Sequence, residues 1–516
     1  MRRACLLLTI SLCLIFAAGT TVVEVRQRTP APPNRPTWDA QPLAPVVWLE
    51  AAPEAGTEKT PTYALIPSGD ARLSEAERLI DNEPARFTRR LIAWAWKTFG
   101  APADWSDMRL PIVLQMGGNY ARSGFRLRAN SAIEEHTSVP YIILELDAPS
   151  LSDTLLHEGG HVLHSIATRG RRPTTDWSAM MHTTFAVTDP LTALAEGYAI
   201  HFETLLGHYG SDPEKRAYYH RVGPAFDLKN SRRAEFYAPI TDLLTFSQSW
   251  ARYQAVRDTW PAFVGHVYPD DYLRSQFDPA RDRAVLKPAN AMIASEGVVA
   301  SVLFWTSVSL ADAGGARFGE GLEQPGLVAA EQELLRAIAA LPPKSGFRPD
   351  LVDLVAGIGA PGSTARSVAV TRFVSVTRGV TARPAIRAMW TALYANAIAL
   401  DTDAAKPLFE ALDSTRSDIV AAALGDAGEL RRGLGPVLPV SAAKVLLELK
   451  VFQQKFPLEF DLNAATESEW RAAGANAPTR AKVLAERDRA PFASIEDFER
   501  RIGTTLAALG LTRAEY

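Results

Sequence analysis

Apolar residues recur near helical spacing along residues 74–99 and predict a helix there. Its apolar face would be formed by Leu79, Ile80, Phe87, Leu91, Trp94 and Phe99. Two shorter runs, residues 110–116 and 141–146, are rich in aliphatic and β-branched residues, are bounded by Pro and Gly, and predict two strands. From about residue 190 to 457 the pattern is mostly helical, with breaks around residues 314–326 and 342–349. The expected fold class is therefore α+β, mostly helical, with a small sheet.

The segment LLHEGGHVLHSI, residues 155–166, lies in a further predicted helix whose two ends carry recognisable signals. Ser150 can cap the N-terminus, with Asp153 at the third helical position. Gly170 can end the helix, and Pro173 follows just beyond it. These signals predict a helix of about 18 residues.

Two histidines, His157 and His161, stand four positions apart in this helix and so share one face. Both imidazoles can reach one metal ion, whereas Glu158 points about 100° away, from where it can hold the attacking water. The pattern predicts a Zn²⁺ site with Glu158 as the general base. The alternative is an ordinary helix whose two histidines are solvated or are hydrogen-bonded within the core.

Two adjacent glycines, Gly159 and Gly160, occupy the interior of the same helix. Each costs about 1 kcal/mol relative to Ala at such a position. A helix that carries both is expected to be approached closely on that side, by another backbone or by a substrate.

A third metal ligand is needed, because a catalytic zinc commonly has three protein ligands and one open position. Glu196 is the strongest candidate, since it lies among apolar residues in a helix that Asp189 can cap and Pro190 can begin. The alternative is a surface glutamate beside Gly197. Glu296, which also lies in a strongly apolar helix and precedes a Gly, is a rival for the same role.

HEGGH followed by a downstream Glu in an EGYA context resembles the gluzincin branch of the zinc metallopeptidases. The resemblance covers roughly residues 75–210 and implies a zincin-like core in which His157, His161 and Glu196 bind zinc and Glu158 is the general base. It also implies that the strand at residues 141–146 can pair with extended substrate. Two features depart from the pattern: residues 162–195 form a longer interval than in the best-known members, and Ile200 stands where some members place an Asp that supports a ligand His.

Several other polar residues are candidates for stabilising the oxyanion or for contacting the ligands from behind. His182, Tyr198 and His201 belong to this group, and the sequence does not choose among them. Glu296 would line the cleft, pair with a partner in the core, or replace Glu196 as a ligand. His164, one turn beyond His161, is expected to be a hydrogen-bonded core residue rather than a fourth ligand.

The N-terminus has the pattern of an export signal. Arg2 and Arg3 precede an apolar stretch at residues 5–16, and small residues at 17–19 suit signal peptidase. An uncleaved membrane anchor is an alternative, because apolar character continues to Val25. The protein is expected to be exported, with a periplasmic or other extracytoplasmic location.

Composition adds two limits to this picture. The chain has 516 residues, 47% of them hydrophobic and 22% charged, with a formal net charge of −3. This balance excludes a nucleic-acid binder driven by bulk charge. Cys5 and Cys13 both lie in the export signal, so the mature chain would have no thiolate to offer a metal.

The C-terminal segment, residues 461–509, resembles the helix-hairpin-helix module of ComEA-like competence proteins. The similarity rests on DLNAAT at 461–466 and on APFASIEDF at 490–498. The family's Gly-rich hairpins present backbone N–H groups to DNA phosphates. Here Asn476 replaces one hairpin Gly, and nine acids stand against eight bases from Asp461 onward, which disfavours DNA as a partner.

The sequence thus predicts five segments: a signal peptide or anchor at 1–25, a Pro-rich linker at 26–60, a zincin-like domain at 61–210, a helical domain at 211–457 and a helix-hairpin-helix module at 458–516. The expected function is an exported zinc metallopeptidase that acts on a peptide or protein. Two alternatives stay open: an envelope DNA-binding protein with an inert zincin domain, and a catalytically dead scaffold.

Overall fold

The computed structural model describes residues 42–52, 60–115, 119–129, 132–146, 151–169, 190–214, 216, 287–341, 349–398, 402–449, 454–465 and 467–514. The predicted export signal, both cysteines and His182 lie outside these residues. Among the residues that are described, no helix combines the length and apolar character needed to span a membrane.

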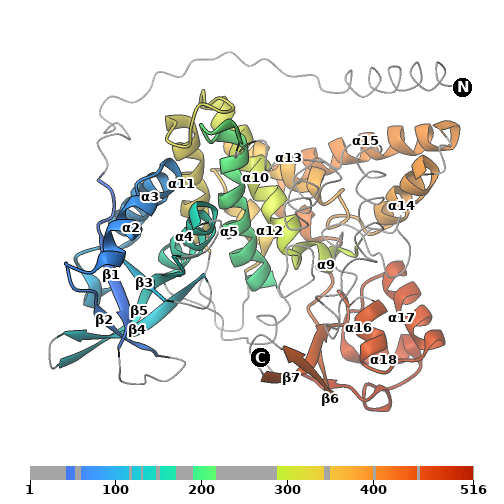
Figure 1. The fold of residues 1–516 in the computed structure, drawn as a ribbon. Helices are drawn as coiled ribbons and strands as arrows, with labels where there is room; N and C mark the ends of the chain where they lie inside the picture. The colour runs from blue at the N-terminus through green and yellow to red at the C-terminus, as the bar shows by residue number, and fades with distance from the viewer. Residues whose placement is uncertain are drawn as a thin grey trace, which may run out of the picture.

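Five strands near the N-terminus close into a small barrel in the order β1-β2-β4-β5-β3 (Figure 1). They are β1 Val46–Ala51, β2 Thr62–Leu65, β3 Leu110–Leu114, β4 Tyr120–Ala129 and β5 Ala132–Leu144. Aromatic and aliphatic side chains fill the interior, among them Tyr63, Trp105, Phe125 and Tyr141. The strands predicted at 110–116 and 141–146 are confirmed as β3 and the end of β5, whereas β1, β2 and β4 were not predicted.

The end of β5 is paired on both sides. Ile142 and Ile143 lie opposite β4 in antiparallel register and opposite β3 in parallel register. Just beyond the strand, the backbone N–H of Glu145 donates to the side chain of Asn119 at 2.8 Å. The expectation that this strand pairs with an extended substrate is therefore wrong, because the barrel already occupies both of its edges.

The helix predicted over residues 74–99 is two helices, α2 Ala71–Leu79 and α3 Glu83–Phe99. Asn82 caps α3 by accepting from the backbone N–H of Ala85 at 3.0 Å, and Pro84 lies in the first turn. The continuous apolar pattern suggested a single helix, although Asn82 and Pro84 in the sequence are typical of the start of a second one. The apolar face of α3 packs against α4, the helix that carries HEGGH.

The remaining helices extend from the barrel across to the C-terminal segment, with α4 against β4 and β5 and with α14 and α15 at the far end (Figure 1). They are α4 Leu151–Ala167, α5 Pro190–Tyr209, α9 Ala289–Ile293, α10 Glu296–Ala313, α11 Pro325–Ala339, α12 Leu351–Gly357, α13 Thr364–Val376, α14 Ala385–Ile398 and α15 Thr402–Gly425. The break predicted around residues 314–326 is confirmed between α10 and α11, whereas most of the break predicted around 342–349 lies outside the described residues. One hydrophobic core runs through these helices from α3 to α15 and so continues across residue 210.

The C-terminal segment has its own hydrophobic core, centred on Trp470, Phe492 and Phe498. It contains α16 Glu467–Ala472, α17 Ala477–Arg489 and α18 Ile495–Ile502. Beside them lies a sheet of order β7-β6-β8, formed by β7 Gln454–Asp461, β6 Pro439–Leu449 and β8 Thr512–Arg513. The helical pattern predicted up to residue 457 is wrong here, because pairing between β6 and β7 overrides the helix-forming residues of VSAAKVLLEL.

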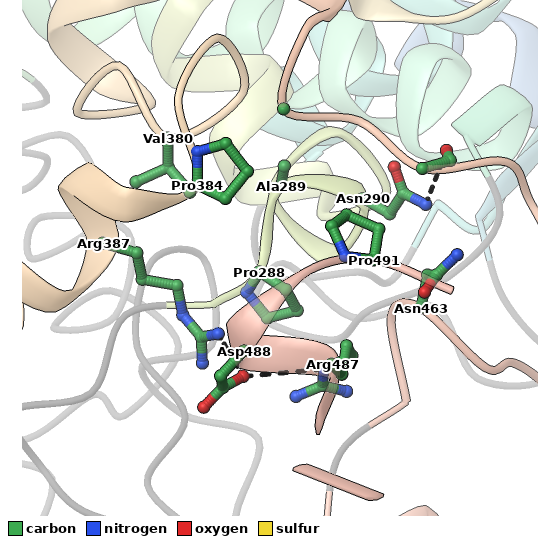
Figure 2. Close-up of a pocket in the computed structure, with 12 residues that line it drawn as sticks. Pro288, Ala289, Asn290, Val380, Pro384, Arg387, Asn463, Arg487, Asp488 and Pro491 are labelled. Carbon is green, nitrogen blue, oxygen red and sulfur yellow. Dashed lines mark hydrogen bonds and ion pairs between the residues drawn. The ribbon is translucent and has the colours of Figure 1, made fainter. Parts of the chain in front are cut away.

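Figure 2 shows where this module meets the helices, around a small pocket that is partly open to solvent. Arg387 of α14 pairs with Asp488 of α17. The side-chain amide of Asn290 donates to the carbonyl of Gly435 at 3.0 Å. These contacts fix the module onto α9 and α14.

Candidate metal centre

The glycine pair of α4 lets two helices approach the motif closely. A Cβ added at Gly159 would lie 2.3 Å from the Cγ2 of Thr88 on α3. A Cβ added at Gly160 would lie 2.8 Å from the Cα of Ala199 on α5. The predicted close approach is confirmed, and neighbouring protein provides it on both sides. The cost of two helical glycines is offset by packing that brings α5 against the histidine helix.

Helix α5 is held in the same way on its other flank. A Cβ at Gly197 would lie 2.5 Å from the Cγ1 of Val299 on α10. Pro190 is the first residue of α5, as predicted, so Glu196 lies well inside regular helix. Helix α5 is therefore packed closely against α4 and α10, and the direction of its side chains is set by both neighbours.

This packing brings His157, His161 and Glu196 together. The Oε2 atom of Glu196 lies 3.2 Å from the Nε2 of His161 and 3.8 Å from the Nε2 of His157. One donor atom from each of the three residues lies within 4.8 Å of the other two. Two imidazoles and a carboxylate match the donor set of a catalytic zinc site, so these residues fit the metal that the motif implies.

The three side chains are partly exposed to solvent. Their side-chain exposed fractions are 22% for His157, 13% for His161 and 18% for Glu196. Glu158 is buried, with 7% exposed, on the turn of α4 that carries His157. The three partly exposed donors can be reached by a small ligand such as water. Glu158, which is adjacent to His157 in the chain, can then act on that ligand as a base.

Glu203 is the residue that the sequence analysis missed. It lies seven positions after Glu196 in α5, and its Oε2 is 3.3 Å from the Nδ1 of His157. Only 2% of the Glu203 side chain is exposed. A carboxylate behind a ligand histidine fixes the orientation and tautomer of the ring. Glu203 lies behind His157, and its signal in the sequence was the seven-residue spacing from Glu196, which puts both acids on one face of α5.

Three carboxylates surround His157 and set its protonation. Burial lowers the pKa of the His157 imidazole, but the contact with Glu203 and the charges of Glu158, Glu203 and Glu196 raise it by more. The net shift of the His157 pKa is upward. The three carboxylates therefore favour a positive charge next to His157. Either a proton on the imidazole or a bound divalent cation can provide that charge.

The other candidate polar residues of α5 face away from the three donors. The hydroxyl of Tyr198 donates to Glu331 of α11 at 3.4 Å, and the Nε2 of His201 lies 3.1 Å from the same carboxylate. Glu296 begins α10 and is buried, and its backbone carbonyl lies against Gly197. In the part of the chain that the structure describes, the only such donor cluster contains Glu196 and not Glu296.

Replacing Glu203 with Gln should weaken zinc binding by about 10- to 100-fold, as is typical when a carboxylate behind a ligand histidine is changed. The amide keeps the volume of the side chain but loses the charge that orients the His157 ring. The dissociation constant can be measured by competition with a chromophoric chelator. Glu134→Gln, a change at an exposed position of β5, is the control. Equal affinities in both variants would contradict the role given to Glu203.

In the C-terminal module, side chains accept from backbone N–H groups at both places where the sequence analysis predicts a hairpin. Asn476 caps α17 by accepting from the backbone N–H of Thr479 at 2.9 Å. Glu499 accepts from the backbone N–H of Leu506 at 2.8 Å, in the second hairpin. Phosphate binding at these places would have to displace a side-chain oxygen, and in one case a carboxylate.

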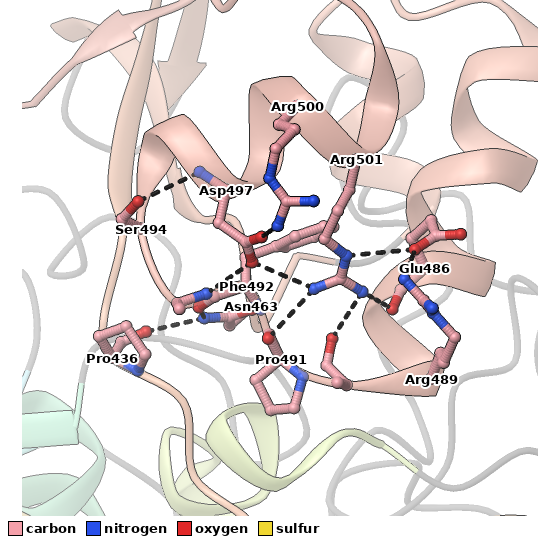
Figure 3. A network of polar contacts seen from close by, with 12 residues as sticks. Pro436, Asn463, Glu486, Arg489, Pro491, Phe492, Ser494, Asp497, Arg500 and Arg501 are labelled. Atoms are coloured by element: carbon pink, nitrogen blue, oxygen red, sulfur yellow. Dashed lines mark hydrogen bonds and ion pairs between the residues drawn. The ribbon is translucent and has the colours of Figure 1, made fainter.

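The basic residues of the module are also engaged. The Arg501 side chain lies 3.1 Å from Glu486 and 3.3 Å from Asp497, and its guanidinium lies 4.5 Å from the ring centroid of Phe492. Figure 3 shows this cluster from close by. Arg500 pairs with Asp497, and Arg489 pairs with Glu486. Each of these guanidinium groups is thus paired with an acid of the same module.

Binding to duplex DNA is therefore expected to be weak and to vanish by about 0.2 M salt, since few phosphates would be neutralised. Fluorescence anisotropy of a labelled duplex, titrated at several salt concentrations, measures this. Tight binding that is lost on deleting residues 460–516 would contradict the expectation and would favour a DNA-binding protein.

Comparisons of the chain with protein-family models, with curated proteins and with solved structures find no match.

Proposed function

We propose that this protein is a zinc-dependent metallopeptidase with a zincin-like core. The observation that carries the proposal is the convergence of His157, His161 and Glu196 from two helices, with Glu158 beside them and Glu203 behind His157. The HEGGH and EGYA motifs resemble those of gluzincins, which are peptidases, and this likeness supports a peptide or protein substrate. The N-terminal sequence pattern supports an exported, periplasmic enzyme.

The residues of the site have separate tasks. His157, His161 and Glu196 would hold the ion, which when bound polarises the scissile carbonyl and lowers the pKa of water to about 7. Glu158, as general base, takes a proton from the attacking water and passes it to the leaving amine. Glu203 holds the His157 ring through Nδ1, so that Nε2 stays directed toward Glu196.

Two other functions compete with this one. An envelope DNA-binding protein would depend on the C-terminal module, whose hairpin N–H groups at Thr479 and Leu506 are already bonded to side chains. A catalytically dead scaffold would not need an acid at position 158 or a carboxylate behind His157. The complete set of acids and imidazoles at one site favours the enzyme over both.

Metal analysis of the purified mature protein tests the proposal. We expect about one zinc per chain, together with hydrolysis of an unfolded protein substrate that stops when a chelator removes the metal and returns when zinc is restored. A protein that binds no zinc after incubation with the free ion would sink the proposal and favour the two alternatives.

A further inference from the structure

A second polar cluster lies on the side of α5 away from the candidate ligands. Its centre is Glu331 of α11, which is completely buried. The Ser307 hydroxyl donates to its Oε1 at 2.5 Å, the Tyr198 hydroxyl to its Oε2 at 3.4 Å, and the His201 Nε2 lies 3.1 Å from Oε1. His201, Ser307 and Tyr198 are also fully buried. A carboxylate in this position is expensive to bury and is held by three polar groups.

Two of those three groups come from the helix that carries Glu196. At about 100° per residue, Glu203 lies within about 20° of Glu196 on α5. Tyr198 and His201 lie about 200° and 140° away from Glu196, on the opposite side of the helix. Thus Tyr198 and His201 on one face of α5 bond to Glu331, and Glu196 and Glu203 on the opposite face contact the two histidines of α4.

Rotation of α5 about its axis would disturb both faces together. Turning Glu196 and Glu203 away from α4 would also pull Tyr198 and His201 off Glu331 and leave a buried carboxylate with fewer partners. The close packing of Gly160 on Ala199 and of Gly197 on Val299 fixes where α5 lies, and the hydrogen bonds to Glu331 add a directional constraint on its opposite face.

We infer that Glu331, acting through His201 and Tyr198, is a positioning residue that sets the rotation of α5 and so aims Glu196 and Glu203 at the two histidines of α4. This inference rests on the proposed zinc site. Glu331 is bonded to the side of α5 that faces away from Glu196 and would act on the candidate ligands through that helix.

The test compares zinc affinities of folded full-length variants, measured by chelator competition after circular dichroism and thermal unfolding confirm the fold. Glu331→Gln keeps the shape but replaces one acceptor oxygen with a donor, and should raise the zinc dissociation constant about tenfold, the lower end of the range for residues that support ligands indirectly. Asp350→Asn is the matched control. Asp350 is also a buried acid of the helical core, paired with Arg431 at 2.8 Å, and its variant should lose thermal stability without losing zinc affinity.

Variants of His201 test the same link should Glu331→Gln fail to fold. His201→Leu removes the donor and should raise the dissociation constant, whereas His201→Gln retains an N–H donor and should recover most of the lost affinity. Wild-type affinity in Glu331→Gln or in His201→Leu would overturn the inference, as would an equal loss in Asp350→Asn. A wild-type protein that binds no zinc would overturn the proposed function as well, which separates the two failures.

Discussion

Glu158→Gln is expected to bind zinc as tightly as the wild-type protein and to lose hydrolysis of an unfolded protein substrate. Glutamine has nearly the same volume, so the buried position on α4 is preserved. Its amide cannot accept the proton of the attacking water. A general base contributes about 10²- to 10⁴-fold to rate, and kcat should fall by that factor with little change in KM.

The chain offers a matched control for this change. Glu469 in the C-terminal module is also a buried glutamate, with 5% exposed against 7% for Glu158. Glu469→Gln should therefore show wild-type activity once folding is verified. Wild-type rates in Glu158→Gln, with one zinc bound, would remove the general-base assignment and leave the metal assignment standing.

The local part of the site could be predicted from the sequence. The four-residue spacing of His157 and His161 requires only that residues 151–167 form a helix, and this helix is confirmed. Gly159 and Gly160 indicated a close approach because their cost in a helix is known without reference to the fold. The three candidate ligands do lie together in the structure, and the binding of zinc itself stays a prediction.

The relation between helices could not be predicted in the same way. Glu203 reaches His157 only because Ala199 packs on Gly160, which fixes how α5 crosses α4. Tyr198 and His201 looked like candidates for the site, and their partner Glu331 lies far away in the sequence. Periodicity within one helix carries no information about which neighbouring helix each face will meet.

Closure of the barrel was hidden for a related reason. Ile142 and Ile143 form a recognisable strand, but whether a strand has a free edge depends on pairing with distant segments. Here β3 and β5 pair in parallel, and β1 joins β3 to β2, which completes the ring. The strand beside the motif was correctly predicted, and the substrate-binding role inferred for it was wrong.

The largest effect on metal binding is expected from Glu196→Ala. A structural zinc site with four protein ligands in a peptide contributes about 10–16 kcal/mol, which is about 3 kcal/mol per ligand. Loss of the Glu196 carboxylate should therefore lower the zinc affinity roughly 100-fold. The Oε2 of Glu196 lies 3.2 Å from the Nε2 of His161 and is the only carboxylate oxygen of the candidate donor set. Chelator competition measures the change directly.

Glu296→Ala is the informative counterpart, since both acids lie in apolar helices and both precede a glycine. Glu296 is 1% exposed at the start of α10 and lies behind α5, where its backbone carbonyl would be 3.0 Å from a Cβ at Gly197. Removing its side chain should lower thermal stability, because a buried side chain is lost from the helical core, and zinc should stay bound with nearly unchanged affinity. A greater loss of zinc affinity in Glu296→Ala than in Glu196→Ala would reverse the assignment of the third ligand. The reversed result would also require α5 to turn its Glu196 face away from α4. That rotation would break the contact of Ala199 with Gly160 and the hydrogen bond of His201 with Glu331 on the opposite side of the helix.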